Sequence, residues 1–421
     1  MKIKISGGHV VDPVGLKEIK QDILIENGVI VEAMSGDPDQ VIDATGLAVL
    51  PGLVDPHTHL RDPGFEYRED IVSGTRAAVR GGITAVACMP NTKPVTDNPA
   101  IVRYIRDKAQ REGACKVLPV GAVSKNQDGK ELAEIGLMAE AGIVAISDDG
   151  KPVLTADLMK KAIQYAAQFD LTVISHCEEP SLAEGGHMNE GLVSLELGLR
   201  GIPTIAEEIM VARDILVAEY VGLPVHLAHL STAGSIELVR QAKARGVKVT
   251  CETCPHYFTL TEEACRDFNT SAKMNPPLRT QKDVDAIIAG LRDGTIDMIG
   301  TDHAPHHADE KQIEFGLANN GIIGFESSFA LGYTYLVLPG HLTLPELVAK
   351  MSTRPAELLH QRMGRLEPGY PADIALVELE KPFMFDKNAS ASKARNTPYH
   401  GWMLRGQVKM TLCDGKVVFP W

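Results

Sequence analysis

The sequence predicts an α/β fold, a (β/α)8 TIM-like barrel joined to a small β domain that both ends of the chain build together. Eight short apolar runs alternate with amphipathic stretches between residues 47 and 300, the pattern of parallel strands buried on both faces. Both ends of the chain instead consist of short strands separated by turn residues. A length of 421 residues suits a barrel of about 250 residues with a further domain.

The barrel elements follow one another in a regular order. Strands are expected at 47–55, 83–89, 115–121, 142–147, 171–175, 224–228, 247–251 and 297–300. Helices are expected at 69–81, 99–113, 156–169, 207–222, 235–246 and 283–294, and several of these end in glycine, a common helix stop. An open doubly wound sheet is the alternative, but its dinucleotide-binding form has a glycine-rich loop after the first strand. Here that strand ends in Asp55-Pro56-His57-Thr58-His59, and the count of eight favours the barrel.

The two ends of the chain are predicted to fold together. Neither 1–51 nor 365–421 has enough residues to bury a core alone. We therefore expect one composite β-sandwich domain from these segments, with the barrel spanning 52–364. Asp414-Gly415 is a favourable hairpin turn between the last two strands.

Composition excludes several classes of function. The formal net charge is −13 and no block is dense in Lys or Arg, which argues against nucleic acid or an anionic membrane as partner. No apolar run approaches the ~20 residues of a membrane span, and the N-terminus lacks a signal peptide, so a cytoplasmic location is expected. Seven scattered cysteines indicate reduced thiols, and the single Cys251-x-x-Cys254 pair is a weak zinc or redox signal.

Candidate metal ligands follow the predicted strands. In such barrels the active site forms at the carboxyl ends of the strands. His57 and His59 are two residues apart and so share one face of the first strand. Alone, such a pair more often has a surface or packing role than a metal-binding one. Because His176, His229 and Asp302 follow other strands, the set indicates a site for Zn²⁺, Mn²⁺ or Co²⁺.

The number of donors favours two metal ions, because five are too many for one four-coordinate ion, with Asp149 as the candidate bridge. Two ions ~3.5–4 Å apart can activate a shared water and polarise a carbonyl group. We therefore expect hydrolysis, or its reversal, at a carbon–nitrogen or ester bond. Asp302 is the natural proton carrier.

Other residues at the same rim indicate an anionic ligand. Arg61 shares the face of the two histidines, and a guanidinium binds a carboxylate in bidentate fashion. Asn91, Asn275 and His306 add neutral polar groups. The structural alternatives are a salt bridge from Arg61 to Asp62 or Glu66, and loop-stabilising bonds for the two asparagines.

The remaining histidines and one cysteine are not assigned to the site. His9, His341, His360 and His400 are expected to be solvated or packed. His187, His256, His303 and His307 are expected to support the site or the fold, and Cys177 should face away from the metal because it neighbours His176 on a strand.

These motifs resemble one known family. The segments are PGLVDPHTHLRDPG, ACMPNTKPVTDN, AISDDGKPV, ISHCEE, HLAHLSTAGS, MNPPLR, GTDHAPH and NGIIGFE, together with the closing PADIALV and SKARNTP. The whole chain is similar to class I dihydroorotases of the amidohydrolase superfamily. The resemblance implies a (β/α)8 barrel with a composite β domain, and a hydrolase that interconverts (S)-dihydroorotate and N-carbamoyl-L-aspartate in pyrimidine (UMP) biosynthesis.

The resemblance also implies residue roles. Zinc would be bound by His57, His59, Asp149, His176, His229 and Asp302. Two zinc ions per subunit are expected, and whether the second site is fully occupied stays open. Asp302 would be the catalytic acid/base. The substrate would be held by His59, Arg61, Asn91, Asn275, His306, Asn320 and Gly321. Asp149 stands where many superfamily members have a carboxylated lysine, and Asn320 departs from the Phe or Pro usual in relatives.

Two other functions remain open from the sequence. One is a hydantoinase or allantoinase, which would use the carboxylated lysine. The other is an inactive homologue that serves as a scaffold for aspartate transcarbamoylase. Relatives also imply a homodimer, and residues 308–321 are placed to cover the site.

Overall fold

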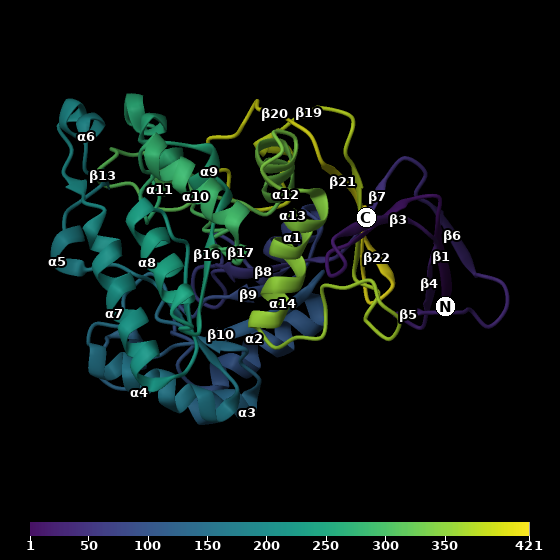
Figure 1. The fold of residues 1–421 in the computed structure, drawn as a ribbon, viewed down its shortest axis with the longest axis horizontal. Coiled ribbons are helices and arrows are strands. Elements are labelled where there is room, and N and C mark those ends of the chain that lie inside the picture. The colour runs from purple at the N-terminus through teal and green to yellow at the C-terminus, as the bar shows by residue number, and fades with distance from the viewer. Residues whose placement is uncertain (421) are drawn as a thin grey trace.

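A nearly closed barrel of parallel strands lies in the middle of the structure (Figure 1), a computed structural model that describes residues 1–420. The strands pair in the order β17-β16-β15-β12-β11-β10-β9-β8. Their bounds are β8 (Leu53–Thr58), β9 (Ile83–Cys88), β10 (Lys116–Gly121), β11 (Ala145–Ile146), β12 (Thr172–Ser175), β15 (Val225–Leu227), β16 (Val249–Thr253) and β17 (Met298–Ile299). The predicted fold class is confirmed.

The ring closes at its carboxyl rim. The chain leaving β17 reaches β8 through a parallel bridge between Thr58 and His303. The amide of His59 donates to the carbonyl of His303 at 2.9 Å. Closure therefore brings the segment after β17 beside His57 and His59, which lie at the end of β8 and just beyond it.

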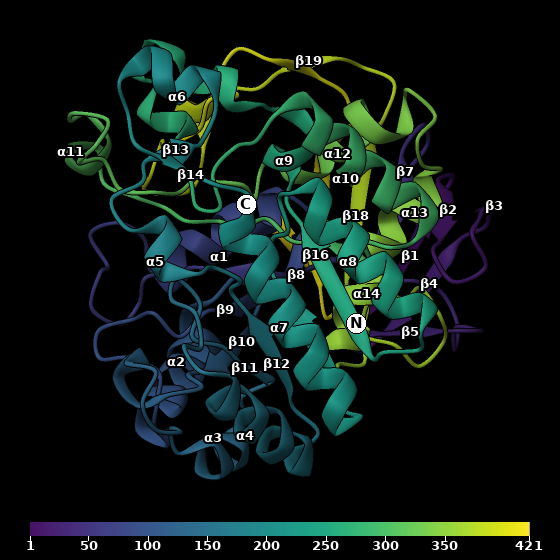
Figure 2. The same cartoon turned by 60° about the vertical axis from the view of Figure 1, so that its left-hand side comes forward.

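Helices cover the outside of the barrel (Figure 2). All six predicted helices are present, and α3 is an additional one. The bounds are α1 (Ile71–Arg80), α2 (Pro99–Glu112), α3 (Ile135–Ala141), α4 (Ala156–Ala166), α7 (Ile205–Val221), α8 (Ala233–Ala244) and α10 (Gln281–Asp293). Their ends follow local chemistry: Asp70 caps α1 by accepting from the amide of Ser73 at 2.7 Å, and Gly81 ends that helix.

Shorter elements decorate the barrel. Between β12 and α7 lie α5 (Pro180–Ala183), β13 (Met188–Asn189), α6 (Leu192–Leu197) and β14 (Gly201–Ile202). The others are α9 (Pro255–Thr259), α11 (Ala308–Lys311), α12 (Ser328–Gly332), α13 (Leu344–Val348) and α14 (Arg354–Leu358). Among the described residues, no helix is long and apolar enough to cross a membrane.

Strands from both ends of the chain lie beside the barrel, where both termini are found (Figure 1). One sheet contains β1 (Lys2–Ser6), β4 (Ile23–Glu26), β5 (Val29–Val31) and β6 (Gln40–Asp43). The other contains β2 (His9–Asp12), β3 (Lys17–Lys20), β7 (Ala48–Pro51), β18 (Ile374–Glu378), β21 (Gln407–Cys413) and β22 (Lys416–Phe419), and a separate pair is β19 (Phe383–Met384) with β20 (Met403–Leu404).

These sheets enclose a small apolar core of their own. Ile5 and Ile25 from the first sheet pack in one buried cluster with Ile374 and Leu412 from the second. The β21–β22 turn has positive φ at Asp414 and Gly415, as the predicted hairpin requires. Where the boundary between the two domains falls stays a prediction.

Candidate metal centre and active site

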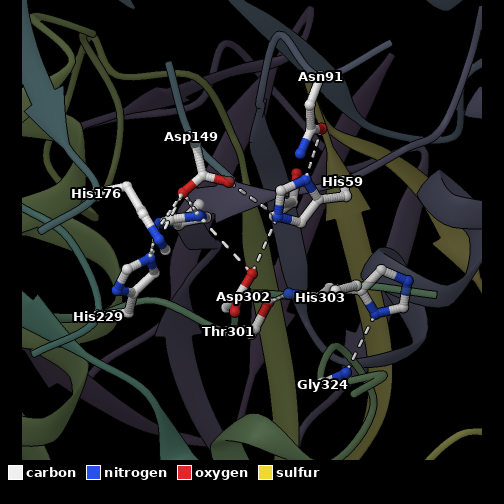
Figure 3. A network of polar contacts seen from close by, with 12 residues as sticks. His59, Asn91, Asp149, His176, His229, Thr301, Asp302, His303 and Gly324 are labelled. Carbon is white, nitrogen blue, oxygen red and sulfur yellow. Dashed lines mark hydrogen bonds and ion pairs between the residues drawn. The ribbon is translucent and has the colours of Figure 1, made fainter. Parts of the chain in front are cut away.

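Asp149 lies at the centre of the group of predicted metal ligands (Figure 3). Its Oδ1 lies 3.1 Å from His57 Nε2, 3.5 Å from His229 Nε2 and 3.7 Å from His176 Nδ1. Its Oδ2 lies 3.4 Å from His59 Nε2. One carboxylate thus faces imidazoles from the carboxyl ends of three different strands of the barrel.

Asp302 completes the group on the other side. Its Oδ1 lies 3.0 Å from His59 Nε2 and 3.7 Å from His57 Nε2. The six predicted ligands, which lie up to 245 residues apart in the chain, therefore meet at one point of the rim. They are His57, His59, Asp149, His176, His229 and Asp302, and all are buried.

The chemistry of this group fits divalent cations. Two trios have ligand atoms within 4.8 Å of one another: His57, Asp149 and His229, and His57, His59 and Asp302. Buried atoms without a hydrogen-bond partner include His57 Nε2 and Asp149 Oδ1, and such atoms are costly unless something binds them. Imidazole nitrogens and carboxylate oxygens are ligands that Zn²⁺ accepts.

Both carboxylates are held in the ionised form. Burial alone would raise the pKa of Asp149, but the charge of His57 and the close approach of the His229 and His57 rings hold it well below its usual value. Burial likewise opposes ionisation of Asp302, yet its hydrogen bond with His59 and the charge of His57 lower its pKa. Two buried anions side by side favour a cationic ligand.

The two histidines of β8 are oriented by residues behind them. His57 Nδ1 lies 2.7 Å from Glu252 Oε1, and Glu252 Oε2 lies 3.4 Å from His226 Nε2. His59 Nδ1 lies 2.9 Å from Asn91 Oδ1. A carboxylate or amide oxygen at Nδ1 fixes the proton there and leaves Nε2 free to ligate.

Sequence reasoning did not identify Glu252. The signal was present, because this carboxylate directly follows the predicted seventh strand, as the ligands follow other strands.

Three residues of the site have a backbone conformation that is uncommon for side-chain-bearing residues. The φ angles are 60° at Arg61, 36° at His229 and 46° at Asp302. Positive φ turns the chain sharply out of the strand direction, and such strain is concentrated at functional sites. Each of these three side chains borders the same cavity.

A cavity of about 220 Å³ opens beside the candidate ligands. It is lined by every residue predicted to bind substrate: His59, Arg61, Asn91, Asn275, His306, Asn320 and Gly321. The structure therefore brings these residues together next to Asp149 and Asp302.

Arg61 is the main positive group of the cavity. It is buried; its Nε donates to the carbonyl of Pro305 at 3.2 Å, and its Nη2 lies 3.3 Å from His306 Nε2. Burial, followed by the charge of Arg68, lowers the pKa of Arg61 to about 10, so the group stays charged at neutral pH. Asp62, its suggested salt-bridge partner, instead pairs with Lys108 at 2.6 Å.

His306 is neutral in this setting. Burial and then the charge of Arg61 lower its pKa to about 2. Its Nε2 lies 2.7 Å from the carbonyl of Asn320, so that nitrogen carries the proton and donates. His306 thereby links the end of the eighth strand to the segment that borders the cavity.

Residues left out of the site have other contacts. His303 stacks on Phe325 with ring centroids 3.7 Å apart. His256 packs against Tyr257, and burial lowers its pKa to about 3. His307 caps α11, accepting from the amide of Asp309 at 3.3 Å.

The cysteines also lie outside the group of ligands. Cys177 Sγ contacts the carbonyl of Ser175 and Asp214 Oδ2, each at 3.7 Å, so it points away from the ligands. All seven cysteines are buried and free, including the Cys251-x-x-Cys254 pair.

Known proteins resemble the chain along its whole length. A family model described as Dihydro-orotase-like matches residues 46–235. A dihydroorotase from Acetivibrio thermocellus is 58% identical over 98% of both chains, and one from Ruminiclostridium cellulolyticum is 56% identical over 99% of this chain and 98% of its own. The solved L-hydantoinase (dihydropyrimidinase) from Arthrobacter aurescens matches with a TM-score of 0.86 at 25% identity, over 99% of this chain and 95% of its own. The chain therefore belongs to the dihydroorotase family.

Proposed function

We propose that this chain is a zinc-dependent dihydroorotase that interconverts (S)-dihydroorotate and N-carbamoyl-L-aspartate in pyrimidine biosynthesis. The convergence of six buried imidazole and carboxylate groups beside Arg61 in one cavity carries this proposal. Full-length identity of 58% to a dihydroorotase supports the same substrate.

The candidate ligands would hold two zinc ions, one of them more weakly. When bound, such ions lower the pKa of water and polarise a carbonyl group. The chain itself supplies the rest of the chemistry. The two oxygens of Asp149 lie 3.1 Å from His57 Nε2 and 3.4 Å from His59 Nε2, and Glu252 and Asn91 keep these two histidines in orientation.

Substrate binding and proton transfer are assigned to residues of the cavity. Arg61 would bind the carboxylate of the substrate, because its charge is buried and directed into the cavity. Asn275, His306 and the backbone at Asn320–Gly321 would hold the ring. Asp302 would take the proton from the attacking water and give it to the departing ring nitrogen as the carbon–nitrogen bond breaks.

A hydantoinase is the closest alternative, because solved hydantoinases share the fold. Relatives of that kind bridge their metals with a carboxylated lysine. Here Asp149 would take the bridging position, because the nearby Lys151 directs its Nζ to the carbonyl of Gln127 at 3.3 Å. An inactive scaffold is disfavoured because every candidate ligand is present.

A spectrophotometric assay of ring opening tests the proposal. The protein should consume dihydroorotate faster than hydantoin or allantoin, lose activity on dialysis against a chelator, and regain it with Zn²⁺. Metal analysis should find between one and two zinc ions per chain. Absence of turnover by the zinc-loaded protein, or full activity after demetallation, would refute the proposal.

We propose a cytoplasmic homodimer, with association with aspartate transcarbamoylase to be tested separately. Helix α7 supports a protein interface, because Ile205, Ile209, Leu216 and Tyr220 are exposed at intervals that place them along one side. Light scattering of the purified protein, alone and mixed with the transcarbamoylase, measures both associations.

A further inference from the structure

A buried lysine holds the segment that borders the substrate cavity. Lys311 is 5% exposed, and its Nζ donates to the carbonyls of Asn319 at 2.7 Å, Lys273 at 3.2 Å and Gly321 at 3.2 Å. An ammonium group has three N–H donors, so each has one carbonyl acceptor. Two of these carbonyls flank Asn320, on either side of a peptide that lines the cavity.

A second buried lysine extends this support. Lys273 Nζ donates to the carbonyls of Phe315 at 2.7 Å and Gly316 at 3.1 Å. The carbonyl of Lys273 also accepts from the amide of Gly321 at 3.0 Å. Lys273 therefore holds the segment 308–321 at two places. Its side chain binds the middle, at Phe315 and Gly316, and its carbonyl binds the end, at Gly321.

Asn396 supports the same segment from the closing part of the chain. Its Nδ2 donates to the carbonyls of Ala304 and Gly321, each at 3.0 Å. Its Oδ1 accepts from the amide of His306 at 3.1 Å. One amide side chain thus joins the end of the eighth strand to the cavity-lining segment.

These lysines are unusual because no carboxylate neutralises them. Among residues 1–420, neither Lys273 nor Lys311 forms an ion pair with Asp or Glu. Burial, and then repulsion by Lys273, lowers the pKa of Lys311 to about 7. A buried ammonium group is costly unless its donors are satisfied. Here backbone carbonyls accept from both ammonium groups, and that of Lys273 also lies 5.5 Å from the centre of the Phe315 ring.

The geometry leaves the cavity-lining backbone little freedom to shift. Gly321 has φ of 145°, and a Cβ atom there would lie 2.6 Å from the carbonyl oxygen of Ala304. The carbonyl of Asn320 contacts His306 Nε2 at 2.7 Å. A displacement of this backbone would therefore also move His306.

We propose that Lys311 is a positioning residue for the substrate, and that with Lys273 and Asn396 it sets where the Asn320–Gly321 backbone meets the bound ring. The inference rests on the proposed function, because it assumes that this backbone contacts dihydroorotate. Lys311 touches no candidate metal ligand, so its loss should weaken substrate binding more than it slows the chemical step.

The test is the variant Lys311→Met, which keeps most of the length of the side chain and removes its donors. KM for dihydroorotate should rise about tenfold or more, while kcat changes by less than about threefold. Lys282→Met, at an exposed lysine on α10, is the matched control and should leave both constants unchanged. A wild-type KM in Lys311→Met would overturn the inference, whereas failure of the wild type to open dihydroorotate would instead refute the proposed function.

A second variant covers the case in which Lys311→Met does not fold. Asn396→Asp keeps an oxygen that accepts from the amide of His306, but it replaces the Nδ2 donor by a second oxygen that repels the carbonyls of Ala304 and Gly321. The backbone at Gly321 should therefore shift, and KM should rise as in Lys311→Met. Asn388→Asp, exposed in the same connection, is its control. Hydrogen exchange of peptides from 308–321 should speed up in both test variants, even without substrate. Unchanged exchange together with unchanged KM in Asn396→Asp would also overturn the inference.

Discussion

Replacement of Arg61 by methionine should separate substrate binding from chemistry. Arg61 is 8% exposed, and its guanidinium stays charged at neutral pH, since burial lowers its pKa only to about 10. Its Nε is occupied by the carbonyl of Pro305, which leaves the two Nη groups for a ligand. Methionine replaces the unbranched stem of arginine and offers no donor, so a carboxylate in the cavity would lose its cationic partner.

The size of the effect follows from the bonds removed. A hydrogen bond to a charged group contributes about 1.5–3 kcal/mol net of the bond to water that it replaces. A bidentate contact between Arg61 and a carboxylate makes two such bonds, and the variant loses both. A net loss of about 3 kcal/mol corresponds to a rise in KM of about 100-fold. We expect kcat to fall by less than about tenfold, because Arg61 binds a group that does not react.

Steady-state kinetics with dihydroorotate measure this effect. Arg61→Lys should be intermediate, because an ammonium group cannot reproduce the planar fork. Arg76→Met, at an exposed arginine of α1, is the control and should behave as wild type. Dihydrouracil, which has the same ring without the carboxylate, should inhibit wild type and Arg61→Met equally. An unchanged KM for dihydroorotate, or a loss of dihydrouracil binding as large as that of dihydroorotate, would refute the assignment.

Two further predictions concern proton transfer and thiol chemistry. Asp302→Asn should keep most of its metal, because the other five candidate ligands remain, but kcat should fall by about 10²–10⁴-fold. Turnover assays together with metal analysis measure both effects. An undiminished rate would exclude Asp302 as proton carrier. Burial raises the pKa of Cys88, Cys251 and Cys265 to about 12, so these thiols carry no thiolate at pH 8 and should react with a disulfide reagent only after denaturation. Rapid labelling of the native protein would contradict this expectation.

Much of the fold and of the candidate metal site could be predicted, because both depend on the order of residues within and just after single strands. Strand residues two apart share a face, which places His57 with His59. Parallel strands end at one rim, which brings Asp149, His176 and Asp302 to the same place once the barrel is recognised. Short decorations such as α6 and β13 could not be predicted, because a few residues carry too weak a periodicity.

The sequence by itself determined the barrel, the six candidate ligands and the rim on which they lie. Only the tertiary structure decided which residues orient these ligands and hold the backbone that lines the cavity. Glu252 meets His57 across 195 residues of chain, and Asn396 reaches Gly321 from the closing segment. Lys311 and Lys273 bind carbonyls instead of carboxylates. Backbone carbonyls belong to every residue and leave no mark in the sequence, so such contacts become visible only when the closed barrel sets the distances.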